Sequence, residues 1–438
     1  MPSNARVLIL DVAALGWDFI QDLPGNLRGG IPFRPMETVF PALTCPVQAS
    51  FRTEALPCFH GVAANGFYDR TLARTFFWEQ SATLIYGQRL WNEWRSKGRT
   101  VGMMFWQHCL GEAADLLLTP KPIHKHHGGM IQDCYSRPPN LYQDLTRKTG
   151  RTFDLMHYWG PLASARSSEW IADAVIEVMR LPKQAPDLLM AYLPHLDYEL
   201  QRSGPRSARS RKALLKTLAL LQRIRTGAEA SGYDVVLFGD YAMVPVTRPP
   251  VYLNRRLREA GFFQVRHIAG RTYPDFSASE AFALADHEMA LVYVQNKTSI
   301  QKVRKWIEQT EGVAEVLDMK GSLRREIDRM PAGPDFIVLA EEGSWCAYPW
   351  WTDAREAPDF ADHVDIHNKP GYDPCELFWG WPPGRVSRNP ARIGGTHGRA
   401  GPNRRVAWFS SLPFDPEPRN LVELAGSVGQ WLSSNSLP

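Results

Sequence analysis

The sequence lacks most of the features that mark a secreted, membrane-spanning or nucleic-acid-binding protein. Its six cysteines are scattered, with no CxxC pair and no zinc-finger spacing, so we expect reduced thiols and a cytoplasmic protein. No stretch reaches the roughly 18 apolar residues that a membrane span needs, and the first apolar run is too short for a signal peptide. A net charge of +4 over 438 residues does not predict a nucleic-acid polymer as partner, although it suits a small anionic substrate.

What the sequence does contain is the composition of a globular enzyme, with 44% hydrophobic and 22% charged residues. Short continuous apolar runs are typical of strands that are buried on both faces, and amphipathic patterns between them predict helices. The sequence therefore predicts an α/β fold, with a mostly parallel central sheet and helices on both faces. The expected strands are 6–12, 100–106, 187–193, 233–238 and 405–409, and the expected helices are 86–97, 167–180, 210–232 and 418–432.

A change in the pattern of predicted helices and strands in the second half of the sequence predicts an inserted subdomain. From about residue 248 the sequence reads as a short helix and strand (NRRLREAGFF), then a strand, a helix and two further strands. This is an α+β pattern. We therefore predict that 1–247 forms the first part of the core, 248–345 a small α+β insert, and 346–438 the closing part of the core.

Three aspartates follow apolar strand runs. Asp11, Asp197 and Asp240 each lie at or just past the carboxyl end of a predicted strand. The carboxyl ends of parallel strands meet at one edge of a sheet, where open α/β sheets bind ligands. Carboxylates gathered there repel one another unless a cation lies between them. The pattern therefore predicts a divalent metal site.

The stretch 36–69 does not read as ordinary amphipathic packing. It reads as a loop, a short helix and a second loop, and it places Thr44 between Pro41 and Pro46. A Gly- and Asn-containing turn, 60–66, follows it. A hydroxyl held in such a loop is a candidate nucleophile once a neighbouring group activates it.

Several histidines are further candidates. His397 is flanked by glycines and is well exposed for ligation, and Asp365 and His367 lie two residues apart in a Trp-rich segment that is typical of a pocket wall. For the pair Asp286–His287 we prefer a structural role to a ligating one. We expect the loop histidines to be solvated surface rather than a metal cluster; these are His124, His126 and His127.

Taken in order, these motifs resemble the alkaline phosphatase superfamily, in particular a divergent bacterial subgroup of its type I phosphodiesterase/nucleotide pyrophosphatase branch. The motifs that carry the resemblance are LILDV, VFPALTCP, HGVAANGFYD, LPHLDYELQRSGP, FGDYAM and GGTHG. The resemblance implies that Thr44 attacks phosphorus and that Asn65 holds a phosphoryl oxygen. It also implies a set of metal ligands, namely Asp11, Thr44, Asp197, Asp240 and His397.

Two positions depart from the family pattern, because Gln201 and Tyr241 stand where the family has metal-binding histidines. Glutamine and tyrosine are weaker zinc ligands than imidazole. Three interpretations stay open. The site binds harder ions such as Mn²⁺ or Mg²⁺; or other groups substitute, with His367 and Asp365 preferred over His287; or one of two metal sites is lost.

The resemblance implies a metal-dependent hydrolase of phosphodiester or phosphoanhydride bonds that works through a phosphothreonine intermediate on Thr44. We expect two divalent ions, with Zn²⁺ preferred over Mn²⁺ and Mg²⁺, one held by Asp11, Asp240 and Thr44. The other would be held by Asp197, His397 and His367. The alternatives are a hydrolase of a phosphomonoester, phosphonate or sulfate ester, and a non-catalytic binding protein. The sequence leaves the substrate and the oligomeric state open.

Overall fold

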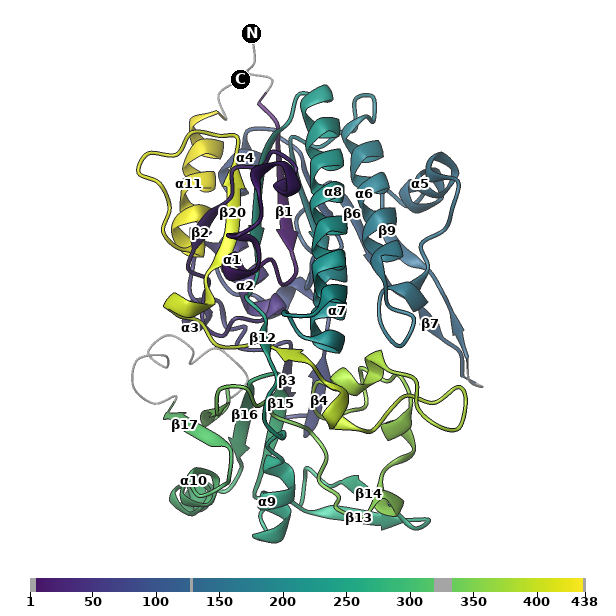
Figure 1. Ribbon diagram of the computed structural model, residues 1–438, viewed down its shortest axis with the longest axis vertical. Helices are drawn as coiled ribbons and strands as arrows, with labels where there is room; N and C mark the ends of the chain where they lie inside the picture. Colours follow the sequence, from purple (N-terminus) through teal and green to yellow (C-terminus); the bar gives the residue numbers. More distant parts are fainter. Residues whose placement is uncertain (1–4, 127–128, 319–332, 436–438) are drawn as a thin grey trace.

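The computed structural model describes residues 5–126, 129–318 and 333–435. Figure 1 shows a large sheet with flanking helices in the upper part of the molecule and a smaller sheet below it. The carboxyl end of β1 points down toward the smaller sheet. Among the described residues, no helix has both the length and the apolar character needed to span a membrane.

The large sheet has eight strands in the order β2-β20-β11-β1-β10-β5-β6-β9. Its five central strands are parallel, and antiparallel strands close both edges. The predicted α/β class is confirmed. The parallel strands are β11 (Asp234–Gly239), β1 (Val7–Val12), β10 (Leu188–Leu193), β5 (Val101–Met104) and β6 (Leu116–Pro120). The edge strands are β2 (Arg34–Met36) and β9 (Cys134–Arg137), and β20 (Val406–Ser410) lies between β2 and β11.

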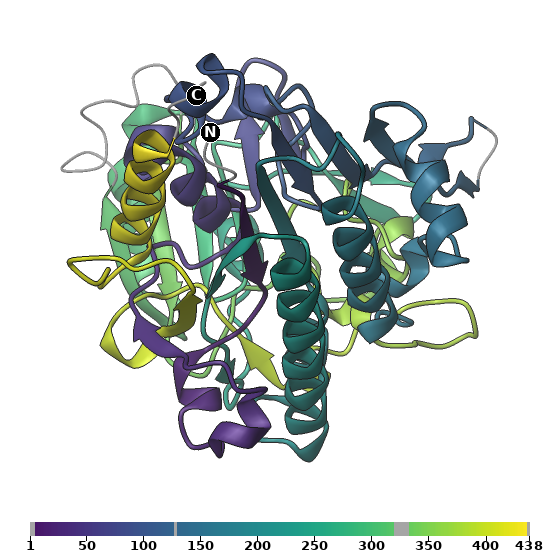
Figure 2. The ribbon, with the colours of Figure 1, turned by 90° about the horizontal axis from the view of Figure 1, so that it is seen from above.

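Helices cover both faces of this sheet (Figure 2). The helices α6 (Ala165–Met179) and α8 (Ala208–Ala230) pack together on one face, and α2 (Thr44–Thr53) and α11 (Leu421–Ser434) pack together on the other. The predicted helix 86–97 is wrong in extent, because α4 covers only Asn92–Ser96. Gly87 has φ +94°, a left-handed conformation that a helix cannot continue through.

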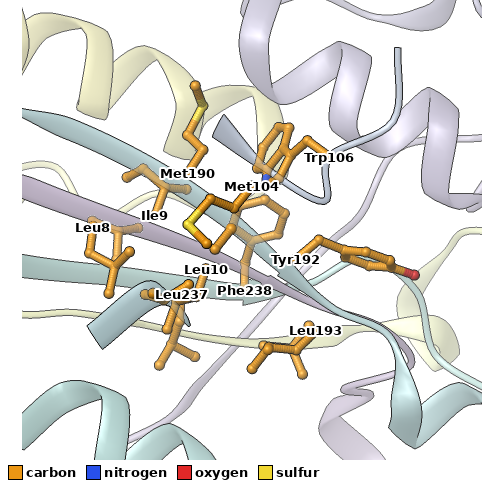
Figure 3. Close-up of a cluster of buried hydrophobic side chains, with 14 of the residues drawn as sticks. Leu8, Ile9, Leu10, Met104, Trp106, Met190, Tyr192, Leu193, Leu237 and Phe238 are labelled. Atoms are coloured by element: carbon orange, nitrogen blue, oxygen red, sulfur yellow. The ribbon is translucent and has the colours of Figure 1, made fainter. Parts of the chain in front are cut away.

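The core lies on both sides of the parallel strands because successive side chains alternate between the faces. Figure 3 shows Ile9, Met190 and Phe238 on one side and Leu193 and Leu237 on the other, and all five are buried. Asp11 follows Ile9 by two residues, so it belongs to the face that packs against α2. This alternation decides which helix meets the aspartate at the end of β1.

The smaller sheet is antiparallel, in the order β15-β16-β18-β17, and falls within residues 248–345. Its hydrophobic cluster also takes in Leu43, Tyr68 and Trp350 from outside that range, so the boundaries of the insert stay a prediction. The predicted short helix is followed by a strand, as expected, and this strand begins at Val265. The elements here are α9 (Leu253–Glu259), β13 (Val265–Ile268), β14 (Arg271–Pro274), β15 (Ala281–Asp286), β16 (Met289–Val294), α10 (Ile300–Glu308), β17 (Val313–Asp318) and β18 (Phe336–Ala340).

Shorter elements complete the described chain. They are α1 (Trp17–Ile20), α3 (Pro57–His60), β3 (Gly66–Asp69), β4 (Arg74–Phe77), β7 (Ile123–His124), β8 (Met130–Ile131), α5 (Leu141–Thr149), α7 (His195–Ser203), β12 (Val244–Pro245) and β19 (Gly395–Thr396). The two-stranded pair β12-β19 joins the chain after β11 to the segment that carries His397.

Candidate active site

Three carboxylates gather at the carboxyl end of the parallel strands. Asp11 is the fifth of the six residues of β1 and pairs in register with residues of β10 and β11. Asp240 directly follows β11, and Asp197 lies in the first turn of α7, just after β10. Burial raises the pKa of Asp240 well above its usual value, and the nearby carboxylates of Asp11 and Asp197 raise it further. The structure thus brings together the three aspartates that the sequence singled out.

Thr44 is the first residue of α2, so its backbone N–H belongs to the first helical turn, which has no intrahelical acceptors. Its hydroxyl donates a hydrogen bond to Asp240 Oδ2 over 3.3 Å. The positive end of the helix dipole favours negative charge at this position. Thr44 is 3% exposed, so its hydroxyl is held in place by its surroundings.

Asn65 is fixed beside Thr44 by hydrogen bonds on both ends of its amide. Its Oδ1 accepts from the backbone N–H of Cys45 at 3.1 Å, and its Nδ2 donates to Asp286 Oδ1 at 3.2 Å. The backbone N–H of Asn65 donates to the other oxygen of Asp286 at 2.8 Å. A carboxamide nitrogen carries two hydrogens, so one N–H of Asn65 is left for a ligand.

Gln48 is a site residue that the sequence analysis missed. It lies one helical turn after Thr44 on α2, and its Nε2 donates to Asp11 Oδ2 at 2.7 Å. Its Oε1 accepts from the backbone N–H of Gln107 at 2.7 Å. The other oxygen of Asp11, Oδ1, is buried and has no hydrogen-bond partner within the described part of the chain. A glutamine in a buried helix carries no signal of this role in the sequence alone.

Asp197 is satisfied by Gln201 and Tyr241, the two residues that the sequence comparison of motifs singled out as departures. Gln201 Nε2 donates to its Oδ2, and the Tyr241 hydroxyl donates to its Oδ1 at 3.0 Å. His397 lies beside this pair, with Nε2 4.0 Å from Asp197 Oδ1 and Nδ1 2.8 Å from the carbonyl oxygen of Ala42. The carbonyl fixes the tautomer, so Nε2 of His397 carries the free lone pair.

Asp286 and His287 also reach the cluster, although the sequence analysis preferred a structural role for them. His287 Nδ1 lies 2.7 Å from Asp286 Oδ1, and its ring centre lies 3.8 Å from that of His397. His287 is the first residue of the two-residue turn between β15 and β16 and has φ +58°. Non-glycine residues adopt that conformation at a steric cost, and histidine is among the residue types found there most often.

The structure does not bring Asp365 and His367 to this cluster. Asp365 accepts hydrogen bonds from its own loop, at the backbone N–H groups of His367 and Asn368. His367 is exposed, its Nδ1 lies 3.3 Å from the carbonyl oxygen of Phe77, and its ring lies 6.2 Å from that of His124. Of the loop histidines, His127 lies outside the described residues.

Burial controls the electrostatics of the cluster. It raises the pKa of Asp11 to about 8 and that of Asp197 to about 7, against the hydrogen bonds that each carboxylate accepts. Burial also raises the pKa of Asp286 to about 7 and lowers that of His287 to about 3, so this imidazole is neutral near pH 7. The carboxylates therefore face one another in a medium that disfavours their charges, and a cation would relieve them.

The donor atoms fit one divalent cation better than two. Asp11, Asp240 and Thr44 offer oxygen ligands, and the orphaned Asp11 Oδ1 is an open ligand atom. Around Asp197, in contrast, protein donors already occupy both carboxylate oxygens. Within the described ranges, no group of three or more His, Cys, Asp or Glu side chains is arranged to hold a metal ion. An all-oxygen set favours Mg²⁺ or Mn²⁺ over Zn²⁺.

Comparison with known protein families shows where the chain belongs. Residues 15–373 match the family described as type I phosphodiesterase/nucleotide pyrophosphatase. The chain belongs to this family. This phosphodiesterase family member is a hydrolase, so the non-catalytic alternative is set aside. No curated protein matches its sequence.

Solved structures share the fold of this family member at low sequence identity. Murine ectonucleotide pyrophosphatase/phosphodiesterase 5 is 13% identical, with a TM-score of 0.57. Phosphonoacetate hydrolase from Sinorhizobium meliloti 1021, in complex with phosphonoformate, is 14% identical, with a TM-score of 0.59. Each comparison covers 99% of this chain and 96% of the other. An inactive threonine-to-alanine variant of the murine protein, in complex with AMP, gives a TM-score of 0.58 at 13% identity.

Proposed function

We propose that the chain hydrolyses a small anionic ester of phosphoric or phosphonic acid, with Thr44 as the nucleophile and a phosphothreonine intermediate. The observation that carries the proposal is the position of the Thr44 hydroxyl. It lies at the N-terminus of α2, donates to Asp240 Oδ2 over 3.3 Å, and has Asn65 beside it. A nucleophile, a proton acceptor and donors for phosphoryl oxygens thus converge on one point.

The chain's own residues divide the reaction as follows. The Thr44 hydroxyl gives its proton to Asp240 as Oγ1 forms a bond to phosphorus, and the bond from phosphorus to the leaving oxygen breaks. The remaining N–H of Asn65 and the backbone N–H of Thr44 hold equatorial phosphoryl oxygens. Water then attacks phosphorus, the bond from phosphorus to Oγ1 breaks, and Thr44 recovers its proton.

Asp11, Asp240 and Thr44 are the residues that would hold a divalent cation. Bound there, such an ion supplies positive charge against the carboxylates and the anionic substrate, and it lowers the pKa of the coordinated hydroxyl. The need for that charge follows from the contacts of the four aspartates. Within the described part of the chain, no lysine or arginine side chain donates a hydrogen bond to Asp11, Asp197, Asp240 or Asp286.

The structural neighbours support the choice of substrates. The murine protein is inactive when a threonine is replaced by alanine and then binds AMP, and the bacterial hydrolase binds phosphonoformate. Both ligands are small and anionic. We propose a cytoplasmic location for the enzyme, because its six cysteines are scattered along the sequence without paired spacing, a pattern typical of proteins from a reducing compartment.

The test is a comparison of Thr44→Ala with Thr44→Ser on bis-p-nitrophenyl phosphate, p-nitrophenyl phosphate and p-nitrophenyl phenylphosphonate, each with Mg²⁺, Mn²⁺ or Zn²⁺. We expect Thr44→Ala to lose about three orders of magnitude in kcat or more, and Thr44→Ser to keep measurable turnover. Thr53→Ala is the matched control, since Thr53 ends the same helix and its hydroxyl only caps the carbonyl of Ala49. If folded Thr44→Ala hydrolyses its substrates as fast as the wild type, Thr44 is not the nucleophile.

A further inference from the structure

Neutral side chains occupy the surroundings of Asp197. The amide of Gln201 and the hydroxyl of Tyr241 donate to its two oxygens, and Gln201 Oε1 in turn accepts from the Tyr372 hydroxyl at 2.8 Å. All three donors are at most 5% exposed. The chain of hydrogen bonds is complete, so Asp197 has no oxygen without a partner. We call Asp197, Gln201, Tyr241 and Tyr372 the Asp197 network.

The ring of Tyr241 also occupies space on the His397 side. The two rings are parallel, with 1° between their planes and 3.4 Å between their centres. The hydroxyl of Tyr241 points to Asp197, to whose Oδ1 it donates at 3.0 Å. The phenol of Tyr241 thus gives Asp197 a neutral hydrogen-bond donor, at a position where a bound cation would give it a positive charge.

The potential zinc ligands near this position are Asp197, His397 and His287, whose ring centre lies 3.8 Å from that of His397, but among the described residues no three such side chains are arranged to hold a metal ion. His397 Nε2 has no partner within the described residues and lies 4.0 Å from Asp197 Oδ1. Zinc sites in proteins draw three or four protein ligands, and a cation here would first have to break both hydrogen bonds to Asp197. The contrast with Asp11 is direct, because Asp11 keeps one buried oxygen, Oδ1, that has no hydrogen-bond partner among the residues the structure describes.

We propose that the chain binds one divalent cation, at Asp11, Asp240 and Thr44, and that the Asp197 network stands in place of a second. The inference rests on the proposed function, since it concerns the same site. It specifies an enzyme with one metal ion and an all-oxygen ligand set, which takes Mn²⁺ or Mg²⁺ in preference to Zn²⁺. The neutral donors keep Asp197 hydrogen-bonded without a cation, so the gathered carboxylates need one ion rather than two.

The experiment counts bound metal and does not depend on turnover. The full chain is stripped with chelator, titrated with Mn²⁺ in a calorimeter and, after dialysis, analysed for metal content. We expect about one equivalent for the wild type. Replacing both departures, in the double variant Gln201→His and Tyr241→His, supplies two imidazoles beside Asp197 and His397. We expect this variant to bind about two equivalents, the second with a preference for Zn²⁺.

Two further variants locate the ion and control for added histidines. Asp11→Asn keeps the size of the side chain and should lose the single equivalent of the wild type. Gln309→His adds an imidazole at the exposed end of α10, far from the cluster, and should leave the count at one. Circular dichroism checks that each variant is folded; should the double variant not fold, the single variant Gln201→His takes its place.

Two equivalents in the wild type would overturn the proposal, as would one equivalent that persists in Asp11→Asn. A folded double variant that still binds one equivalent would show that the Asp197 network does not stand in for a metal. These results are separate from the nucleophile test. An active Thr44→Ala variant would refute the proposed nucleophile. The number of metal ions bound by the wild type would still test the one-metal proposal.

Discussion

Replacing Asp286 by alanine tests whether the smaller sheet positions the active site. Asp286 ends β15, 221 residues after Asn65, and it accepts two hydrogen bonds from that residue, at 2.8 and 3.2 Å. It also holds His287 Nδ1 at 2.7 Å. Asp286 is fully buried, so water cannot take over these contacts when the carboxylate is removed. We infer that Asp286 is a positioning residue that acts through Asn65.

The size of the effect follows from these contacts. Hydrogen bonds to a charged group contribute about 1.5–3 kcal/mol each, but burial raises the pKa of Asp286 to about 7 and so offsets part of that gain near neutral pH. We expect Asp286→Ala to lower the free energy of unfolding by about 2–4 kcal/mol. A shift of about 1 Å in Asn65 would lower kcat/KM by about 10²-fold.

The assay is a double-mutant cycle with Asn65→Ala, followed by diesterase kinetics and by urea denaturation. If Asp286 acts through the Asn65 side chain, Asp286→Ala will slow the wild type but will not slow Asn65→Ala further. Asp286→Ala with unchanged kcat/KM and unchanged stability would refute the reasoning. Additive losses in the cycle would show that Asp286 works through another group, of which His287 is the nearest.

Three further predictions concern buried polar groups. Gln48→Leu removes the donor to Asp11 and should lower the free energy of unfolding by about 2–4 kcal/mol in urea titrations, and an unchanged midpoint would contradict the assigned contact. Burial raises the pKa of Asp197 from 3.8 to about 7, so the folded protein holds this proton more tightly than the unfolded chain does. In protein stripped of metal by a chelator, the free energy of unfolding should therefore fall by on the order of 4 kcal/mol from this group as pH rises from 4 to above 7. Asp197→Asn should remove that part of the pH dependence, and an identical pH profile of unfolding would contradict the shift. Lys369→Met leaves two buried acidic partners unpaired and should lower the free energy of unfolding by about 3–5 kcal/mol in thermal or urea unfolding. Lys97→Met, which breaks an exposed ion pair, should lower it by less than about 1 kcal/mol, and equal effects of the two variants would refute this difference.

The sequence predicted the part of the site that depends on strand ends. Asp11, Asp197 and Asp240 follow recognisable buried strands, and parallel strands place their carboxyl ends at one edge. Thr44 was recognisable because prolines confine its loop and because the motif around it resembles a known family. The central α/β sheet was predictable because continuous apolar runs of about six residues are typical of buried strands.

Contacts between distant segments were not predictable in the same way. Asn65 and Asp286 are 221 residues apart in the sequence, and no local sequence pattern predicts the hydrogen bond between them. Gln48 is one of many helical glutamines, and only the register of β1 against α2 brings it to Asp11. The choice of Asp365 and His367 as substitute ligands relied on spacing alone, and the fold holds both in a loop elsewhere.

The claim that Thr44 forms a covalent bond to phosphorus is tested most directly by trapping the intermediate. Enzyme turning over bis-p-nitrophenyl phosphate is quenched in acid, digested and analysed by mass spectrometry for the peptide that contains Thr44. The account predicts a p-nitrophenylphosphoryl adduct on Thr44, formed with release of one p-nitrophenolate, that appears at the rate of the burst and is absent from Thr44→Ala. Steady turnover with no adduct on Thr44, together with inversion of configuration at phosphorus with a chiral substrate, would contradict it.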